Sequence, residues 1–136
     1  MKQFQLSSKI GVIGEALAKK YIEGLGHKVL NTNYYYEKGK RSGEIDIITQ
    51  FKGVLHFIEV KTKHVLEKPE KSATLYSYPI EAQVTPSKIR KCLKTVQHYL
   101  RVTKNQNTEY HFDILTVLYN SGEKKAHIQY LQDVFY

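Results

Sequence analysis

The chain has 136 residues, a length that suits one domain with a core of its own. Its single cysteine, Cys92, excludes an intramolecular disulfide and a four-cysteine zinc site, and we expect it to be a buried structural thiol. The formal net charge of +8 favours a polyanionic partner such as nucleic acid. No stretch has the apolar length of a membrane span or a signal peptide, so we expect a cytoplasmic protein without a membrane partner.

The first predicted helix covers residues 10–25, with Ser7 or Ser8 as a possible cap. Apolar residues recur on it at three- and four-residue spacing, which predicts one buried stripe. The stripe consists of Gly14, Leu17, Ala18, Tyr21 and Leu25. Gly24 and Gly26 end the helix.

A short strand is predicted over residues 27–31. Residues 33–42 are polar and tyrosine-rich, with Gly39 and several basic side chains, which is typical of a loop. The run of tyrosines at residues 34–36 could stack on bases, but packing within the loop is the better interpretation.

Residues 45–50 and 55–63 are predicted to form a β-hairpin that turns at Lys52 and Gly53. Paired residue numbers then sum to 105. On the first strand, Ile45 and Ile47 are expected to share one face. Apolar residues occur on both faces of the hairpin, which indicates a sheet covered on both sides.

In this register Asp46 lies directly opposite Glu59, and Lys61 projects from the same face. Like charges in opposed positions destabilise a hairpin, so a divalent cation between them is the simplest explanation. Two carboxylates with retained waters suit Mg²⁺ or Mn²⁺, and Lys61 could activate water or stabilise a phosphorane. The alternative is a charge-compensated cluster in which Lys61 neutralises one carboxylate.

Glu15 lies at the edge of the apolar stripe of the first helix. From there its carboxylate could lean over the sheet toward a metal at Asp46 and Glu59. A solvated charge on a helix surface is the other interpretation, and spacing alone favours it.

Residues 64–84 lack periodicity and are predicted to form a long flexible loop. A second helix starts at Thr85-Pro86, with Thr85 as its cap, and two strands follow over residues 110–119 and 126–131. The expected buried residues of this helix are Ile89, Leu93, Val96, Tyr99 and Leu100. The order αβββαββ indicates an α/β fold around one mixed sheet.

Other candidate residues carry weaker signals. The six histidines show no spacing typical of a zinc site, and His56 and His111 occupy strand positions where a structural role is expected. Asp113 is unusual within an apolar strand, and we expect it to have a packing role as well.

Several spaced motifs run in order from about residue 13 to the end of the chain. They are Gly14-Glu15-Ala16 with Ala18 and Tyr21, Gly26, Asn31-x-Asn33, Gly43-Glu44-Ile45-Asp46-Ile47-Ile48, Phe57-Ile58-Glu59-Val60-Lys61-Thr62-Lys63, Lys88, and Phe112-Asp113. Together they resemble the YraN-like family of predicted endonucleases. That family is similar to the PD-(D/E)xK nuclease superfamily and to archaeal Holliday-junction resolvases.

The resemblance implies a restriction-endonuclease-like mixed β-sheet flanked by helices, and it implies specific roles. Asp46 and Glu59 would be the metal ligands, Lys61 the catalytic lysine, and Glu15 the helix acid that completes the catalytic and metal site. Lys88 matches a basic position of the family, and Lys63 stands where an arginine is frequent. The residues for which we predict nucleic-acid contacts are Arg41, Lys63, Lys88 and Lys91.

The expected function is that of a Mg²⁺- or Mn²⁺-dependent endonuclease acting on DNA, including branched or junction DNA. A four-way junction would suit a symmetric homodimer. One alternative is a non-catalytic nucleic-acid-binding module on a nuclease fold. Another is a partner-binding protein in DNA repair or uptake.

Overall fold

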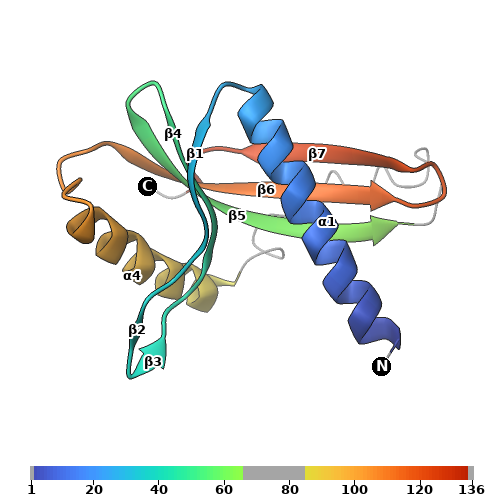
Figure 1. Cartoon of the computed structure of the whole chain (residues 1–136), viewed down its shortest axis with the longest axis horizontal. Coiled ribbons are helices and arrows are strands. Elements are labelled where there is room, and N and C mark those ends of the chain that lie inside the picture. The colour runs from blue at the N-terminus through green and yellow to red at the C-terminus, as the bar shows by residue number, and fades with distance from the viewer. Residues whose placement is uncertain (1, 66–84, 135–136) are drawn as a thin grey trace.

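The computed structural model describes residues 2–65 and 85–134. A five-stranded sheet forms its centre, with the strand order β1-β4-β5-β6-β7 (Figure 1). These strands are β1 (Lys28–Tyr34), β4 (Ile45–Phe51), β5 (Val54–Val65), β6 (Tyr110–Asn120) and β7 (Lys125–Leu131). Strands β5 and β6 are parallel, and the other neighbours in this sheet are antiparallel.

The two helices of the described residues cover opposite faces of this sheet. Helix α1 (Lys2–Gly24) crosses one face, where Ala18 and Ile22 join a buried cluster that includes Ile58 of β5 (Figure 1). Helix α4 (Pro86–Val102) covers the other face, where its Val96 packs in a cluster with Phe57. Adjacent residues of β5 therefore enter different cores, and both the predicted α/β class and the order αβββαββ are confirmed.

Helix α1 differs from its prediction in length and in its buried stripe. It begins at Lys2, so Ser7 and Ser8 lie inside the helix and do not cap it. The buried residues are Gly14, Ala18 and Ile22, with Leu17 half-buried beside them. Tyr21 and Leu25, which were expected in the stripe, are 37% and 44% exposed. The helix contacts the sheet along a narrow row at four-residue spacing, which lets its small side chains approach β5.

The predicted loop over residues 33–42 is wrong. Strand β1 continues to Tyr34, and a short hairpin follows that consists of β2 (Glu37–Lys38) and β3 (Lys40–Arg41). Gly39 supplies the positive φ of 76° at its turn. At its base, the N–H of Ser42 donates to the carbonyl of Tyr36, and the N–H of Tyr36 donates to Ser42 Oγ, both at 2.8 Å.

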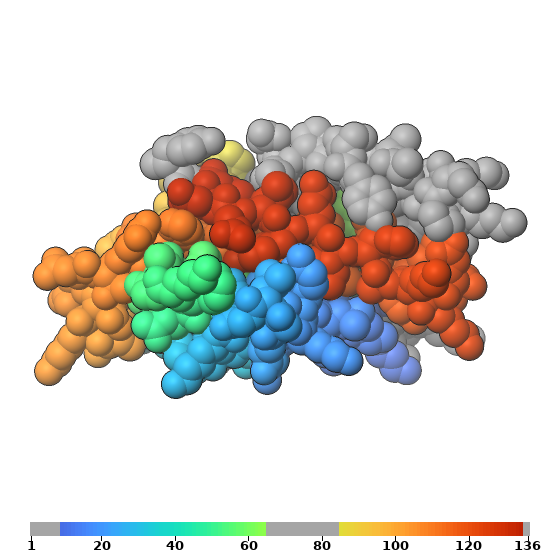
Figure 2. Space-filling model, turned by 90° about the horizontal axis from the view of Figure 1, so that it is seen from above, coloured from blue at the N-terminus to red at the C-terminus, as the bar shows by residue number. Residues whose placement is uncertain are grey.

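The β4–β5 hairpin turns where the sequence predicts. Lys52 and Gly53 have φ values of 50° and 79°, as a two-residue turn between twisted strands requires. Phe51 pairs with Val54, so the predicted register is correct. In the space-filling view, this green turn lies between orange residues after α4 and light-blue residues after α1 (Figure 2).

Helix α4 begins as predicted. Thr85 Oγ1 accepts a hydrogen bond from the N–H of Lys88 at 3.2 Å, and Pro86 opens the first turn. Cys92 is buried as expected, and burial raises the pKa of its thiol to about 12. Of the expected core residues, Ile89 and Leu93 are only half-buried, and Cys92 and Thr95 take their place.

Residues 64 and 65, which were assigned to the long loop, extend β5, and the rest of that predicted loop lies outside the described residues. Within the described part of the chain, none of the helices combines the length and hydropathy that a membrane crossing needs.

Candidate active site

Asp46 and Glu59 lie where the paired part of the β4–β5 hairpin ends. The ladder keeps its register up to the pair Ile47–Ile58 and stops there. One position further, Asp46 Oδ2 accepts a hydrogen bond from the N–H of Val60 at 2.7 Å. The charge of Glu59 also acts on Asp46 and disfavours its ionisation, so the fold does bring the two acids together.

The side-chain alternation of β4 shifts at Asp46. Ile45 packs with Ile48 in the core beneath α4, whereas Ile47 packs in the core beneath α1. The prediction that Ile45 and Ile47 share a face is therefore wrong. The physical reason is that the Asp46 carboxylate bonds to the backbone of β5 beyond the last β4–β5 pair, so the ladder with β5 does not extend through this residue.

The pKa of Asp46 is strongly raised. Burial of the carboxyl group is the largest cause, and the negative charge of Glu59 adds to it. Glu15 contributes in the same direction, whereas the Val60 hydrogen bond and the charge of Lys88 oppose it. The net effect raises the pKa of Asp46 from 3.8 to about 8, so this acid is mostly protonated at neutral pH without a further cation.

Glu59 is only 3% exposed, and its two oxygens differ. Oε1 forms an ion pair with Nζ of Lys88. Oε2 is buried and has no hydrogen-bond partner among the residues that the structure describes. Buried carboxylate oxygens normally have a partner, so this atom is the candidate ligand atom of the site.

Lys88 reaches this site from the first turn of α4. Burial lowers its pKa, but the hydrogen bond to Glu59 and the charges of Glu59 and Asp46 raise it by more. Its side chain remains 43% exposed. The predicted phosphate contact of Lys88 stays a prediction, and the structure adds a carboxylate partner that the sequence did not indicate.

Lys61 is half-buried on β5, two positions beyond Glu59. Residues at this spacing project from the same face of a strand. Within residues 2–65 and 85–134, neither a hydrogen bond nor an ion pair engages its ammonium group. The lysine that pairs with Glu59 is thus Lys88 and not Lys61.

Gly14 allows α1 to approach β5 closely. A Cβ at this position would lie 1.8 Å from Oγ1 of Thr62 and 2.7 Å from its Cβ, so only glycine fits. The next residue, Glu15, is half-buried and lines a pocket of about 190 Å³ together with Asp46. Asn33 Nδ2 donates to Glu15 Oε2 at 3.4 Å. Glu15 thus borders the same pocket as Asp46, and its role as the helix acid of the site stays a prediction.

Residues 14–117, a span that includes every one of these side chains, match the model described as "Uncharacterised protein family UPF0102". The chain belongs to the UPF0102 family. A UPF0102 protein of Chloroherpeton thalassium is 31% identical over 128 residues, which cover 93% of this chain and 88% of that protein. One from Chlorobium limicola is 36% identical over 109 residues, or 80% and 74% of the two chains. A third, from Clostridium novyi, is 28% identical over 133 residues, or 97% and 99%. The resemblance to the YraN-like family is confirmed.

This UPF0102 protein also has a basic pocket of about 550 Å³ between the β2–β3 hairpin and α4. Of the eight described residues that line it, five are basic and none is acidic. They are Tyr36, Lys38, Lys40, Arg41, Ser42, Gly43, Lys91 and Lys94. Gly43 lets the hairpin approach α4, because a Cβ there would lie 2.7 Å from the backbone carbon of Lys91. Thr95 Oγ1 donates a hydrogen bond to the carbonyl of Gly43 and holds this contact.

The four predicted nucleic-acid-binding residues occupy different places. Arg41 and Lys91 line the basic pocket, whereas Lys88 faces Glu59, and Lys63 lies further along β5 than Lys61. Arg41 also forms an ion pair with Glu44 at 2.8 Å, so its guanidinium group is partly engaged.

Lys38, Lys40 and Lys94 of this UPF0102 protein were not predicted to belong to a site. The charged residues on both sides of Gly39 could have indicated an exposed hairpin. Its position against α4 depends on a contact between segments far apart in sequence, which no local pattern shows.

Proposed function

We propose that this protein is a cytoplasmic, metal-dependent endonuclease that hydrolyses phosphodiester bonds in DNA. One observation carries the proposal: the buried Glu59 lies near the half-buried Asp46, and Glu59 keeps an oxygen without a partner among the described residues. The resemblance to the PD-(D/E)xK nucleases supports the same function.

The residues present fit a hard divalent cation. Asp46 and Glu59 offer carboxylate oxygens, which Mg²⁺ and Mn²⁺ prefer. The positive charge of a bound cation would favour the ionised form of Asp46 and so lower its raised pKa. The cation would also provide a partner for Glu59 Oε2. Glu15 would add a third carboxylate from α1. When bound, the cation supplies positive charge for a phosphate oxygen and for the transition state.

The chain's own groups have separate tasks in this reaction. Asp46 must lose its proton before it can serve as a ligand, and the hydrogen bond from Val60 favours the ionised form. Lys61 is placed to stabilise negative charge on the phosphorane or to orient the attacking water. Lys88 neutralises the charge of Glu59 and would be released to contact a phosphate if a metal ion bound Glu59.

DNA is the proposed substrate because five basic side chains line one pocket, where they could contact the phosphates of one DNA strand. Phosphate contacts dominate the affinity of such surfaces. Tyr36 contributes an aromatic ring beside these charges, although it stacks on His98 at 4.0 Å between ring centroids. Selectivity for branched or junction DNA, and a homodimer on a four-way junction, are parts of the same proposal.

One observation favours a second candidate, a nucleic-acid-binding module that does not cut. Lys88 already pairs with Glu59, and the raised pKa of Asp46 keeps that acid neutral. The cluster is thus electrostatically balanced without a cation. On this view the basic pocket binds nucleic acid and the acids stabilise the fold.

Cleavage of labelled single-stranded, duplex, flap and four-way-junction DNA in Mg²⁺, Mn²⁺ or EDTA tests the two candidates. The nuclease requires cutting that depends on metal and disappears in Glu59→Gln. Glu123→Gln is the matched control, because Glu123-Lys-Lys125 repeats the acid-x-Lys pattern in a surface turn. Salt-sensitive binding without any cutting would establish the binding module, and no binding at low salt would favour a protein partner.

A further inference from the structure

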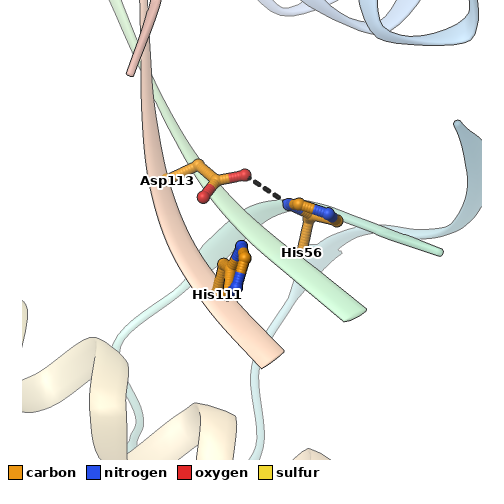
Figure 3. A group of neighbouring side chains, drawn as sticks. All are labelled: His56, His111 and Asp113. Carbon is orange, nitrogen blue, oxygen red and sulfur yellow. Dashed lines mark hydrogen bonds and ion pairs between the residues drawn. The ribbon is translucent and has the colours of Figure 1, made fainter. Parts of the chain in front are cut away.

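A second group of metal-ligating side chains lies on the α1 face of the sheet, opposite the face toward which Glu59 points. Figure 3 shows His56 of β5 with His111 and Asp113 of β6. Their ligand atoms all lie within 4.8 Å of one another. In the parallel register His56 pairs with His111, and Asp113 pairs with Ile58, so all three project from the same face.

The Asp113 carboxylate is held in place by its surroundings. Its Oδ1 accepts a hydrogen bond from the N–H of Asp133 at 2.9 Å, and Oδ2 accepts one from the hydroxyl of Tyr130. The residue is fully buried, as is nearly all of His56. Such outer contacts are what orient a carboxylate that ligates a metal.

The two ring nitrogens of His111 have different surroundings. Nε2 lies 3.4 Å from Oε1 of Glu109, which can fix the ring and its tautomer. Nδ1 is buried and has no hydrogen-bond partner in the part of the chain that the structure describes. Figure 3 shows one ring nitrogen of His111 directed toward the space between His56 and Asp113.

We propose that His56, His111 and Asp113 bind one divalent transition-metal ion, with Zn²⁺ as the best match to the ligand set. The ligands would be Nδ1 of each histidine and Oδ2 of Asp113. Two imidazoles and one carboxylate suit Zn²⁺, whereas the all-oxygen set at Asp46 and Glu59 suits Mg²⁺.

A hydrogen bond joins two of the proposed ligand atoms. His56 Nδ1 and Asp113 Oδ2 lie 2.7 Å apart, and the metal ion would replace the proton of this hydrogen bond. Tetrahedral zinc ligands lie ~3.4 Å apart, so His111 has to turn slightly inward. The ion would join β5 to β6 and, through Asp113, hold Tyr130 and the N–H of Asp133. Its role is therefore structural and independent of the proposed cleavage.

Cobalt titration of the full chain tests the site, because Co²⁺ in a tetrahedral nitrogen-containing site absorbs visible light. The titration is run after chelation, in excess Mg²⁺, which occupies the oxygen ligands. We expect one Co²⁺ per chain, displaced by one Zn²⁺, and the same spectrum in the Asp46→Asn, Glu59→Gln double variant. Absence of stoichiometric binding by the unsubstituted chain would overturn the proposal.

The matched variants are His111→Gln and His98→Gln, both at half-buried histidines. We expect the cobalt spectrum to disappear in His111→Gln and to persist in His98→Gln, whose ring contacts Tyr34 outside the cluster. Zn²⁺ at a hundred times its dissociation constant should raise the melting temperature of the unsubstituted chain by about 5–15 °C. An equal rise in His111→Gln would contradict the site, and circular dichroism checks that this variant folds.

Discussion

The ammonium group of Lys88 on α4 pairs with the carboxylate of Glu59 on β5 and thereby neutralises one of two opposed acids. The pair joins the helix to the sheet at the point where the β4–β5 ladder has ended. A metal ion at Asp46 and Glu59 would compete with this ammonium group for the same carboxylate.

The competition predicts opposite effects of Lys88→Met on stability and on metal affinity. Without metal, the variant should lose about 1–2 kcal/mol of unfolding free energy, because the partner of a buried carboxylate is removed while Lys88 itself is partly exposed. Its affinity for Mn²⁺ should increase. Urea unfolding and Mn²⁺ titration calorimetry measure the two quantities, with the exposed Lys91→Met on the same helix as the control. Weaker Mn²⁺ binding would show that Lys88 assists the cation.

The raised pKa of Asp46 predicts a pH-dependent stability in EDTA. Between its unfolded value of 3.8 and the folded value of about 8, the native state binds more protons than the unfolded state. Stability from this group is therefore complete below about pH 4 and declines as the pH rises to about 8. Melting temperatures of the unsubstituted chain and Asp46→Asn should converge at low pH and differ in slope above it. Parallel curves would contradict the raised pKa.

The raised pKa of Asp46 also predicts that Mn²⁺ binds more tightly as the pH rises from 6 to 8.5, because Asp46 must lose its proton to become a ligand. Calorimetric titration at several pH values in buffers of different ionisation enthalpy measures the affinity and the released proton. An affinity that is constant over this range would exclude Asp46 as the ligand that loses the proton.

If Lys61 acts on the reacting phosphate, Lys61→Ala should reduce cleavage by ~10²–10⁴-fold while the DNA dissociation constant changes only a few-fold. Lys125→Ala, the lysine of the surface acid-x-Lys run, should leave both quantities unchanged. Single-turnover cleavage and fluorescence anisotropy provide the two measurements. Equal losses in binding and cleavage would instead assign Lys61 to DNA binding.

The basic pocket predicts a change in salt dependence. Replacing Lys40 and Lys94 by alanine should lower the slope of log K against log salt by ~0.9 for each phosphate that the variant no longer neutralises. The exposed Lys104 lies outside the pocket, so Lys104→Ala is the control. Anisotropy titrations between low and moderate salt give the slopes. An unchanged slope in the double variant would place the DNA elsewhere.

Gly14→Ala should destabilise the chain by about 1–3 kcal/mol, because the added methyl group meets Thr62 and forces α1 away from β5. Gly11→Ala is the matched control: among the described residues, no atom beyond the adjoining helix backbone lies within 4 Å of its added Cβ, so the change should be neutral or stabilising. Adding Thr62→Ala to the Gly14→Ala variant should restore part of the lost stability. Urea unfolding of the variants tests this, and an equal effect at Gly11 and Gly14 would contradict it.

The turn and register of the β4–β5 hairpin could be predicted because their information is local. Lys52-Gly53 specifies a two-residue turn, and the turn fixes the register that sets Asp46 near Glu59. The start of α4 is equally local, since Thr85 and Pro86 are adjacent.

Other parts of the site depend on contacts that sequence spacing does not contain. The partner of Glu59 is Lys88 because α4 packs on that face, and the spacing pointed to Lys61 instead. His56 and Asp113 meet only because β5 and β6 are parallel in one register. The predicted start of α1 was wrong because the apolar stripe begins well after the helix does.

The parallel pairing of β5 with β6 has a consequence for folding. Leu55 pairs with Tyr110, so the chain must close a loop of about 55 residues before this ladder can form. The β4–β5 hairpin needs only a two-residue turn and can form far earlier. We therefore expect the folding rate to be set by the docking of β6 on a preformed β4–β5 hairpin. The last interactions to appear would then be those that β6 and α4 bring to the hairpin, and nascent chains would expose its apolar residues until β6 has been synthesised.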